Sequence, residues 1–135
     1  MKKKFTNILY WIAMMGLVLY FAYSKGWILA NFESITPQQA QSLLQNDNNV
    51  TLLDVRTIEE FKQGHLRGAK LIPLSVLEKN LDKLRADQNK KIIVYCRSGN
   101  RSVSASRILE KNGFTPLNVK GGIIQLIGAK AEIVK

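Results

Sequence analysis

Residues 92–102 read Ile92-Ile93-Val94-Tyr95-Cys96-Arg97-Ser98-Gly99-Asn100-Arg101-Ser102, and this stretch decides the fold. Its four leading apolar residues are typical of a short buried strand. From Arg101 to Asn112 apolar residues recur at the spacing of one helix face, and Gly113 can cap that helix at its C-terminal end. The only cysteine of the chain, Cys96, is therefore expected on a strand-to-helix turn.

The surroundings expected for Cys96 favour the thiolate over the thiol. Backbone N–H groups of the turn can converge on the sulfur, the helix N-terminus adds partial positive charge, and Arg97 and Arg101 add two full charges. A cysteine after an apolar strand is more often an inert core residue, but a core residue needs no polar run behind it. We therefore predict a nucleophilic Cys96. The predicted anion-binding loop consists of Arg97, Ser98, Gly99, Asn100, Arg101 and Ser102.

Several motifs, in a fixed order, make about residues 33–135 resemble the single-domain rhodanese sulfurtransferases. These motifs are Leu53-Asp54-Val55-Arg56, Glu59-Glu60-Phe61, Gly64-His65-Leu66-Arg67-Gly68-Ala69, Ile72-Pro73-Leu74, the Cys96 loop and Gly121-Gly122-Ile123. The resemblance implies an α/β, rhodanese-like fold with a five-stranded parallel sheet and helices on both faces. The chain departs from the family pattern at Leu126, where the family often has tryptophan, and at Arg67, where it frequently has proline.

Capping signals predict where three helices begin. The capping boxes are Thr36–Gln39, Thr57–Glu60 and Ser75–Glu78, and the first also has a proline at the first helical position. The first helix is expected to end near Gln45 and the second at Gly64. The third helix is expected to bury Val76, Leu77, Leu81 and Leu84.

Strand signals alternate with these helices along the chain. Beyond residues 92–95, short strands are expected at residues 50–53, 71–72 and 117–119, and a short apolar helix at 123–127. Strands that alternate with helices form a parallel sheet covered on both faces, because their crossovers are right-handed. Residues 31–35 are interpreted as a linker into this domain.

Asp54 and Arg56 are expected at the C-terminal edge of the sheet, where ligands bind in open α/β folds. Arg56 is either a cation near the anion loop or the partner of Glu59 or Glu60 in a surface salt bridge. For Asp54 a structural role is favoured, in which the carboxylate accepts hydrogen bonds and braces the loop, as the resemblance implies. His65 is not expected to act as a base, since a stabilised thiolate needs none, and the resemblance implies that it braces a turn instead.

The N-terminal segment, residues 1–30, is predicted to be a membrane anchor. Three lysines stand within the first four residues, and sixteen uncharged residues follow from Ile8 to Tyr23. With the apolar residues Trp27–Ala30 they make residues 8–30 long enough to span a bilayer. Aromatic side chains fall toward both ends of this run, as they do at membrane interfaces.

A cleaved signal peptide is the competing interpretation, because Ala22-Tyr23-Ser24 loosely fits a small-x-small cleavage site. The uncleaved anchor is favoured because the apolar run continues past that site. The positive-inside rule then places the N-terminus in the cytoplasm and the domain at residues 33–135 on the outer, periplasmic side of a bacterial cytoplasmic membrane. A domain that faces the cytoplasm, or one secreted after cleavage, is the alternative.

The resemblance implies a two-step sulfur transfer. Cys96 would take sulfane sulfur from thiosulfate, a persulfide or a polysulfide, carry it as a persulfide, and pass it to a small thiol or a protein acceptor. Two other functions stay open. One is a tethered rhodanese-fold module that binds sulfur or regulates without turnover. The other is a cysteine phosphatase or arsenate reductase, although the four residues between Cys96 and Arg101 make a shorter loop than phosphatases of the related group have.

Composition excludes other classes of function. The net charge is +10, but the basic residues are scattered among ten acids without an aromatic-basic stripe, so nucleic acid is not an expected partner. One cysteine and one histidine make a protein-built metal site improbable and exclude an internal disulfide. No cofactor is expected.

Overall fold

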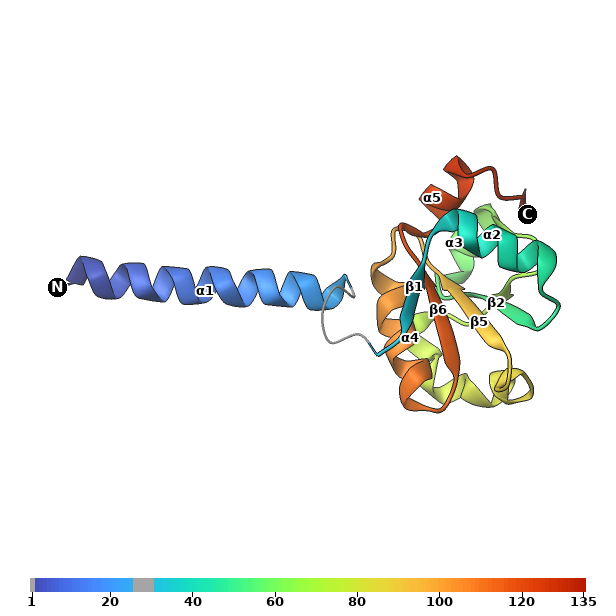
Figure 1. The fold of residues 1–135 in the computed structure, drawn as a ribbon, viewed down its shortest axis with the longest axis horizontal. Helices are drawn as coiled ribbons and strands as arrows, with labels where there is room; N and C mark the ends of the chain where they lie inside the picture. The colour runs from blue at the N-terminus through green and yellow to red at the C-terminus, as the bar shows by residue number, and fades with distance from the viewer. Residues whose placement is uncertain (1, 26–30) are drawn as a thin grey trace. The chain divides into compact units, whose positions relative to one another are not determined.

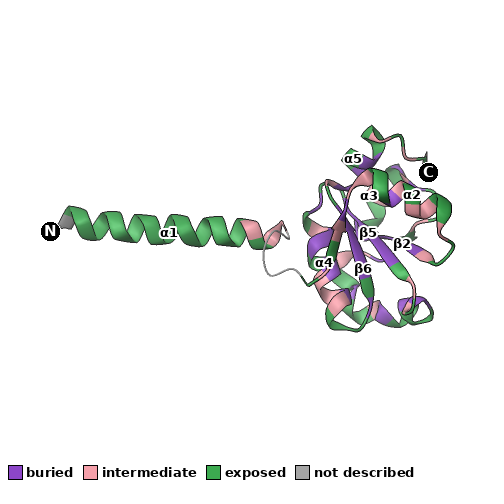
Figure 2. Cartoon of the chain, in the orientation of Figure 1, coloured by how far each residue is buried: buried purple, intermediate pink, exposed green. Residues whose placement is uncertain are grey.

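The computed structural model describes residues 2–25 and 31–135 (Figure 1). The chain divides into two units, residues 1–30 and 31–135. Residues 2–25, the described part of the first unit, contain one helix, α1 (Lys2–Ser24), whose large apolar side chains are exposed along its length (Figure 2). By length and composition, Lys3–Ser24 could cross a membrane. Trp27–Ala30, predicted as part of the same run, lie outside the described residues.

The second unit is built on a five-stranded parallel sheet with the strand order β1-β6-β5-β2-β4. Its strands are β1 (Glu33–Ile35), β2 (Val50–Asp54), β4 (Lys70–Leu71), β5 (Lys91–Tyr95) and β6 (Thr115–Val119). The three central strands are the most deeply buried part of the chain (Figure 2). The five-stranded parallel sheet predicted from the resemblance is therefore confirmed.

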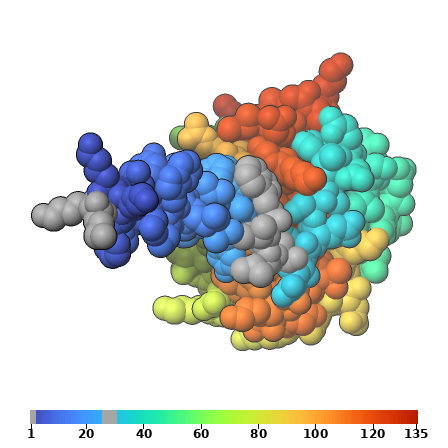
Figure 3. All heavy atoms as spheres, turned by 60° about the vertical axis from the view of Figure 1, so that its left-hand side comes forward, coloured from blue at the N-terminus to red at the C-terminus, as the bar shows by residue number. Residues whose placement is uncertain are grey.

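Helical segments cover both faces of the sheet. Packed on one face are α2 (Pro37–Asn46) and α5 (Gly122–Gly128), where Ala40 and Leu126 join a cluster with Ile93 and Tyr95. The other face carries α4 (Asn100–Lys111) and the 3₁₀ segments η1 (Leu74–Val76) and η2 (Glu78–Asp87). Figure 3 shows the face on which the cyan residues around β1 lie between the red C-terminal segments and the orange α4.

Two of the three predicted capping boxes are confirmed. Thr36 caps α2 and Thr57 caps α3 (Ile58–Gln63), and each exchanges hydrogen bonds with the residue three positions on. The third prediction is wrong. Ser75 lies inside η1, which begins after Pro73 without a side-chain cap, so its hydroxyl is not at a helix start.

The segment after Ser75 consists of 3₁₀ turns, with non-helical backbone at Asn80. Leu77, Leu81 and Leu84 are buried as predicted, but Val76 is 38% exposed. A 3₁₀ helix turns three residues at a time, so it does not present the face that an α-helix of the same sequence would.

The structure adds pairings that the sequence did not predict. Residues 33–35, interpreted as a linker, form β1 and pair with Leu117–Val119 of β6. In addition, β3 (His65–Leu66) and β7 (Ile133–Val134) form a small antiparallel sheet. These strands are two or three residues long, too short to leave a hydrophobic period in the sequence.

The N-terminal end of α5 holds the segment that follows β5. The Ile123 N–H donates to the Cys96 carbonyl at 2.7 Å, and the Ile124 N–H donates to the Arg97 carbonyl at 3.3 Å. Gly122 makes this approach possible, because a Cβ there would lie 2.5 Å from the Arg97 carbonyl carbon, and its φ is +62°. Only glycine adopts this conformation at this separation without strain.

Replacing Gly122 by alanine is expected to lower the free energy of unfolding by about 2 kcal/mol or more, because the new Cβ overlaps the Arg97 peptide at a positive φ. Gly128→Ala, in the same helix, is the matched control, since its Cβ would meet nothing within 4 Å. Urea unfolding of both variants in detergent measures the difference. Equal stability of the two variants would contradict the close approach of α5.

Candidate active site

Cys96 follows β5 directly and lies on the turn into α4, as the sequence predicts. The residue is 1% exposed, and the Gly99 N–H donates to its Sγ at 3.0 Å. The Ser102 hydroxyl lies 3.5 Å from the same sulfur. Gly99 has a φ of +103°, so the chain turns back over the sulfur at this residue. The turn thus directs two polar groups at one buried sulfur atom.

The predicted loop residues fall into two groups. Arg97, Ser98 and Gly99 form the turn, and the first two are exposed. Asn100, Arg101 and Ser102 already belong to the first turn of α4, which begins one residue earlier than predicted. Because a helix N-terminus carries partial positive charge, this placement puts its field beside the sulfur.

The two arginines of this segment differ in their partners. Arg101 is held by Glu60 through two hydrogen bonds, of 2.6 and 2.8 Å, which the sequence analysis did not predict. The Glu60 carboxylate also accepts from Thr57 in the cap of α3. Within residues 31–135, no acidic partner is found for the exposed Arg97. The charge of Arg97 is therefore the one available to an anion at this turn.

The hydrogen bond and charge of Arg101 lower the pKa of Glu60 from its ordinary value of 4.5 to about 2. Glu60 raises the pKa of Arg101 in return, and the nearby Cys96 and Asp54 act in the same direction. Both members of the pair are therefore charged across the physiological pH range.

Asp54 and Arg56 form a buried ion pair behind the turn. Arg56 donates from Nε and Nη2 to the Asp54 carboxylate at 2.7 to 3.0 Å, and Nη2 also donates to the Gly64 carbonyl at 2.7 Å. Asp54 thus accepts from an arginine, as predicted. A surface salt bridge between Arg56 and Glu59 or Glu60 was the wrong alternative, since Arg56 is 5% exposed and its charge is balanced by Asp54.

Tyr95 and His65 complete the support of the site. The Tyr95 hydroxyl accepts from the Leu66 N–H at 3.1 Å, and burial together with Asp54 raises the pKa of Tyr95, so the phenol stays protonated. The His65 ring stacks on Phe61 at 3.6 Å, and its Nδ1 donates to the Phe61 carbonyl at 2.9 Å. His65 therefore braces the end of α3, which is the role that the resemblance implies.

Two pockets flank the Cys96 turn. The larger, of about 380 Å³, lies beside Arg97 and extends along α5 to Ile133 of β7. The smaller, of about 240 Å³, lies beside Arg101 and Ser75, and Arg56 borders both pockets. In the described ranges 2–25 and 31–135, no group of three or more His, Cys, Asp or Glu side chains could hold a metal ion.

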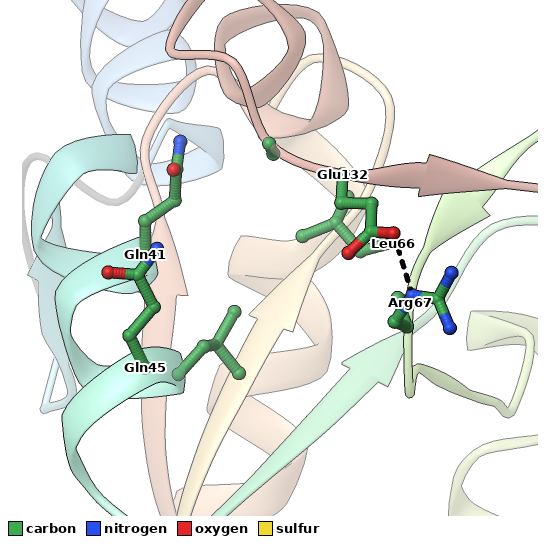
Figure 4. A pocket seen from close by; sticks show the side chains of 7 residues that line it. Gln41, Gln45, Leu66, Arg67 and Glu132 are labelled. Carbon is green, nitrogen blue, oxygen red and sulfur yellow. Dashed lines mark ion pairs between the residues drawn. The ribbon is translucent and has the colours of Figure 1, made fainter.

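A third pocket, of about 180 Å³, lies between α2 and the β3–β7 sheet (Figure 4). Gln41, Gln45 and Leu66 line it, with an ion pair of Arg67 and Glu132 at 2.9 Å. Both members of that pair are well exposed. None of the residues that line this pocket belongs to the Cys96 turn, so the candidate site is the region around Cys96.

Replacing Glu60 by glutamine is expected to lower the free energy of unfolding by about 1 kcal/mol at neutral pH, because a partly buried bidentate ion pair is lost. Since the pKa of Glu60 falls from 4.5 to about 2 on folding, the stabilisation is complete above about pH 4.5 and disappears as the pH falls toward 2. Urea unfolding of the wild-type chain and the Glu60→Gln variant between pH 7 and pH 3 measures this change.

Glu59→Gln is the matched control, because Glu59 is the exposed neighbour of Glu60. The control is expected to follow the wild-type chain at every pH. A difference between Glu60→Gln and the wild-type chain that stays constant from pH 7 to pH 3 would argue against the ion pair as its source.

Comparison with known proteins identifies the family to which the domain is similar. The family model of the rhodanese-like domain matches residues 36–127. The chain is 34% identical over 95 residues to the putative sulfur carrier protein YrkF of Bacillus subtilis, covering 70% of this chain and 50% of YrkF. It is 35% identical over 80 residues to the thiosulfate sulfurtransferase PspE of Escherichia coli, covering 59% of this chain and 77% of PspE.

The fold of this chain is also similar to the fold of a protein whose crystal structure is known. The crystal structure of a rhodanese-like domain protein from Staphylococcus aureus superposes with a TM-score of 0.65 at 34% identity, covering 70% of this chain and 91% of that one. The chain spans half the length of YrkF, so the activity of that whole protein does not transfer with the match. Because the matched region contains every motif quoted from the sequence, including the Cys96 turn, the chain belongs to the family of rhodanese-like domains, which has sulfurtransferases among its members.

Proposed function

We propose that this chain is a sulfurtransferase that carries sulfane sulfur as a persulfide on Cys96. The observation that carries the proposal is the 3.0 Å hydrogen bond from the Gly99 N–H to Cys96 Sγ. That donor, with the N-terminus of α4 behind it, stabilises negative charge on the sulfur before attack and on the persulfide afterwards. The four residues between Cys96 and Arg101 make a shorter loop than phosphatases of the related group have, and this favours sulfur transfer over a phosphatase.

The reaction divides into two displacements at sulfur. The Cys96 thiolate attacks the outer sulfur of thiosulfate, the S–S bond of the donor breaks, and sulfite leaves with the bonding electron pair. An acceptor thiolate then attacks the outer sulfur of the Cys96 persulfide, and Cys96 is released as the thiolate. Arg97 attracts the anionic donor, and the paired Arg101 holds the start of α4 in place beside the sulfur.

The relatives support the same class of substrate and partner. PspE is named a thiosulfate sulfurtransferase and YrkF a putative sulfur carrier protein. By extension, the substrates of this chain are small sulfur anions or persulfides, and its acceptor is a thiol or a protein that carries sulfur. Residues 97–102, with Asp54 and Arg56 in support, form the binding site for the anion in this proposal, and neither a cofactor nor a metal takes part.

The domain at residues 33–135 is, in this proposal, tethered to a bacterial cytoplasmic membrane. The support is α1, whose run of exposed apolar side chains would be unfavourable in water. Lysines before the span favour a cytoplasmic N-terminus and an extracytoplasmic domain. A secretory signal peptide can have the same length and composition as a membrane anchor. The two differ in that the anchor is retained in the mature protein and the signal peptide is cleaved off.

Intact-mass analysis of the full chain in detergent tests the chemistry. Thiosulfate is expected to add about 32 Da, the mass of one sulfur atom, and cyanide or a reductant is expected to remove it. The mass of the Cys96→Ser variant is expected to stay unchanged. If the wild-type chain stays unmodified with thiosulfate and with polysulfide, sulfur transfer from these donors is excluded and the binding module without turnover becomes the better interpretation.

Fractionation of bacteria that express the full chain with a C-terminal epitope tests the tether. The uncleaved protein is expected in the membrane fraction after alkaline carbonate washing, and protease added to spheroplasts is expected to destroy the epitope. A soluble product that begins near residue 25 would show a cleaved signal peptide. An epitope protected in spheroplasts would place the domain in the cytoplasm.

A further inference from the structure

We propose that the exposed side of α5 rests on the surface of an anionic lipid bilayer, so that the domain has a contact with the membrane of its own besides α1. This inference rests on the proposed membrane tether and is independent of sulfur transfer. It assigns a role to the exposed apolar side chains of α5, which the chemistry at Cys96 leaves unused.

The helix α5 is amphipathic. Ile123 and Leu126 on its inner side are buried in the cluster that also contains Ile93. Its outer side is exposed (Figure 2), and there Ile124 and Ile127 are 52% and 55% exposed. Residues three positions apart are neighbours on a helix surface, so these two isoleucines form one apolar patch. Transfer of this patch from water to a less polar medium is favourable.

Basic residues flank the apolar patch. Lys120 precedes α5 and Lys130 follows it, and both are exposed. Neither lysine is in an ion pair within residues 31–135. No acidic residue occurs in the sequence from position 111 to position 131. Apolar side chains between lysines suit an anionic bilayer surface, because the lysines reach the headgroups while the apolar side chains enter the acyl boundary.

The net charge of the domain has the sign that an anionic surface attracts. Four of the twenty basic residues of the chain lie in residues 1–30, and all ten acidic residues lie in residues 31–135. Sixteen basic and ten acidic residues therefore give the domain a net charge of +6. This charge attracts the domain to an anionic bilayer, and the apolar patch selects the side that makes contact.

The length of the tether keeps the domain beside the bilayer. The candidate span ends at Ser24, β1 begins at Glu33, and eight residues lie between them. Eight residues extend over at most about 30 Å. A domain of the length of residues 31–135 has a diameter of roughly the same size. The domain therefore stays within reach of the lipid surface, and this high effective concentration makes a small contact sufficient.

A bilayer fits the patch better than a second protein does. Two half-exposed isoleucines offer much less area than the several hundred square ångströms that each partner buries in a stable protein interface. A lipid surface needs no such area here, because α1 already supplies the anchoring. The occupant of the patch is accordingly the bilayer that α1 crosses.

Spin labels on the full chain test this inference. A Gln125→Cys label in the Cys96→Ser background reports on α5, since Gln125 is exposed there. The chain is placed in nanodiscs of phosphatidylcholine alone or of an equal mixture with phosphatidylglycerol. Collisions with oxygen, which enters lipid, and with a polar nickel chelate, which stays in water, are measured. With phosphatidylglycerol, the label is expected to gain oxygen collisions and lose nickel collisions.

A label at Asn48→Cys is the matched control position. Asn48 is exposed in the turn before β2, at the N-terminal edge of the parallel sheet, whereas α5 follows the C-terminal end of β6. This label is expected to stay in water in both kinds of nanodisc.

Replacing an isoleucine of the patch tests the apolar contact. Ile127→Ser is expected to lower the ratio of docked to undocked Gln125→Cys label by about fivefold, because the side chain no longer gains from leaving water. Val76→Ser is the matched control, since Val76 is 38% exposed in η1, on the other face of the sheet. It is expected to leave the ratio unchanged.

Replacing the flanking lysines tests the charge. Lys120→Gln and Lys130→Gln together are expected to lower the same ratio by about fivefold for each lysine with phosphatidylglycerol, and to change nothing without it. Lys79→Gln with Lys83→Gln is the matched control, because these exposed lysines of η2 lie on the other face of the sheet and their loss changes the net charge equally.

The outcomes separate this inference from the proposed function. Equal nickel collisions for the labels at Gln125 and Asn48 would overturn the inference while the tether and the chemistry of Cys96 stand. Equal shielding of Gln125 in both kinds of nanodisc would overturn the anionic surface. Dipolar broadening between Gln125 labels without a gain in oxygen collisions would identify a second copy of the chain as the occupant. A soluble product that begins near residue 25 would overturn the tether and this inference together.

Discussion

The two hydrogen bonds from α5 to the carbonyls of Cys96 and Arg97 are the constraint on which the site depends. A trans peptide directs its N–H opposite to its C=O. Because both carbonyls point at α5, the N–H groups that follow them point away from it, and the turn is left free to close over the sulfur. The contact exists only because Gly122 lets the two backbones meet. Residues about 25 positions apart in sequence thus shape one turn.

The buried ion pair of Asp54 and Arg56 is a second constraint, which acts from strand β2 of the sheet. Removing two charges from water is costly, and one charge left without its partner would be costlier still. The Asp54 carboxylate and the Gly64 carbonyl offset this cost, because both accept hydrogen bonds from Arg56. Since Gly64 follows α3, the pair fixes the helix whose Glu60 holds Arg101. The end of β2 is in this way connected to the start of α4.

What the sequence predicts correctly is mostly local or carried by motifs. The capping boxes at Thr36 and Thr57 lie within four residues, and both form. The box at Ser75 fails because Pro73 starts a different kind of helix. The local pattern was enough to predict that Cys96 lies on the turn after β5. The ion pair of Glu60 and Arg101, by contrast, joins residues 41 positions apart, and no local pattern encodes such a contact.

The short strands and the pocket also depend on long-range contacts, which local sequence patterns do not encode. β1 and the pairing of β3 with β7 depend on which segments the fold brings together, so three residues of extended chain look like a linker until their partner is known. Ile133 is a wall residue for that reason alone, because only its pairing in β7 brings it beside α5. Motifs indicate the reacting atom, whereas its surroundings are a property of the tertiary structure.

On the proposed mechanism, the pairing of Arg101 leaves Arg97 as the cation at the turn for which residues 31–135 supply no acidic partner, and this suits Cys96, which must be loaded and discharged. Two free arginines would bind the donor more tightly, but they would hold sulfite and the persulfide just as tightly, and uniform binding does not accelerate turnover. With Arg101 balanced by Glu60, attraction of the donor falls to the exposed Arg97. Stabilisation of the sulfur itself falls to neutral groups. The Gly99 N–H donates to Cys96 Sγ, and the Ser102 hydroxyl, which accepts from the Cys96 thiol at 3.5 Å, can turn to donate once the thiolate forms.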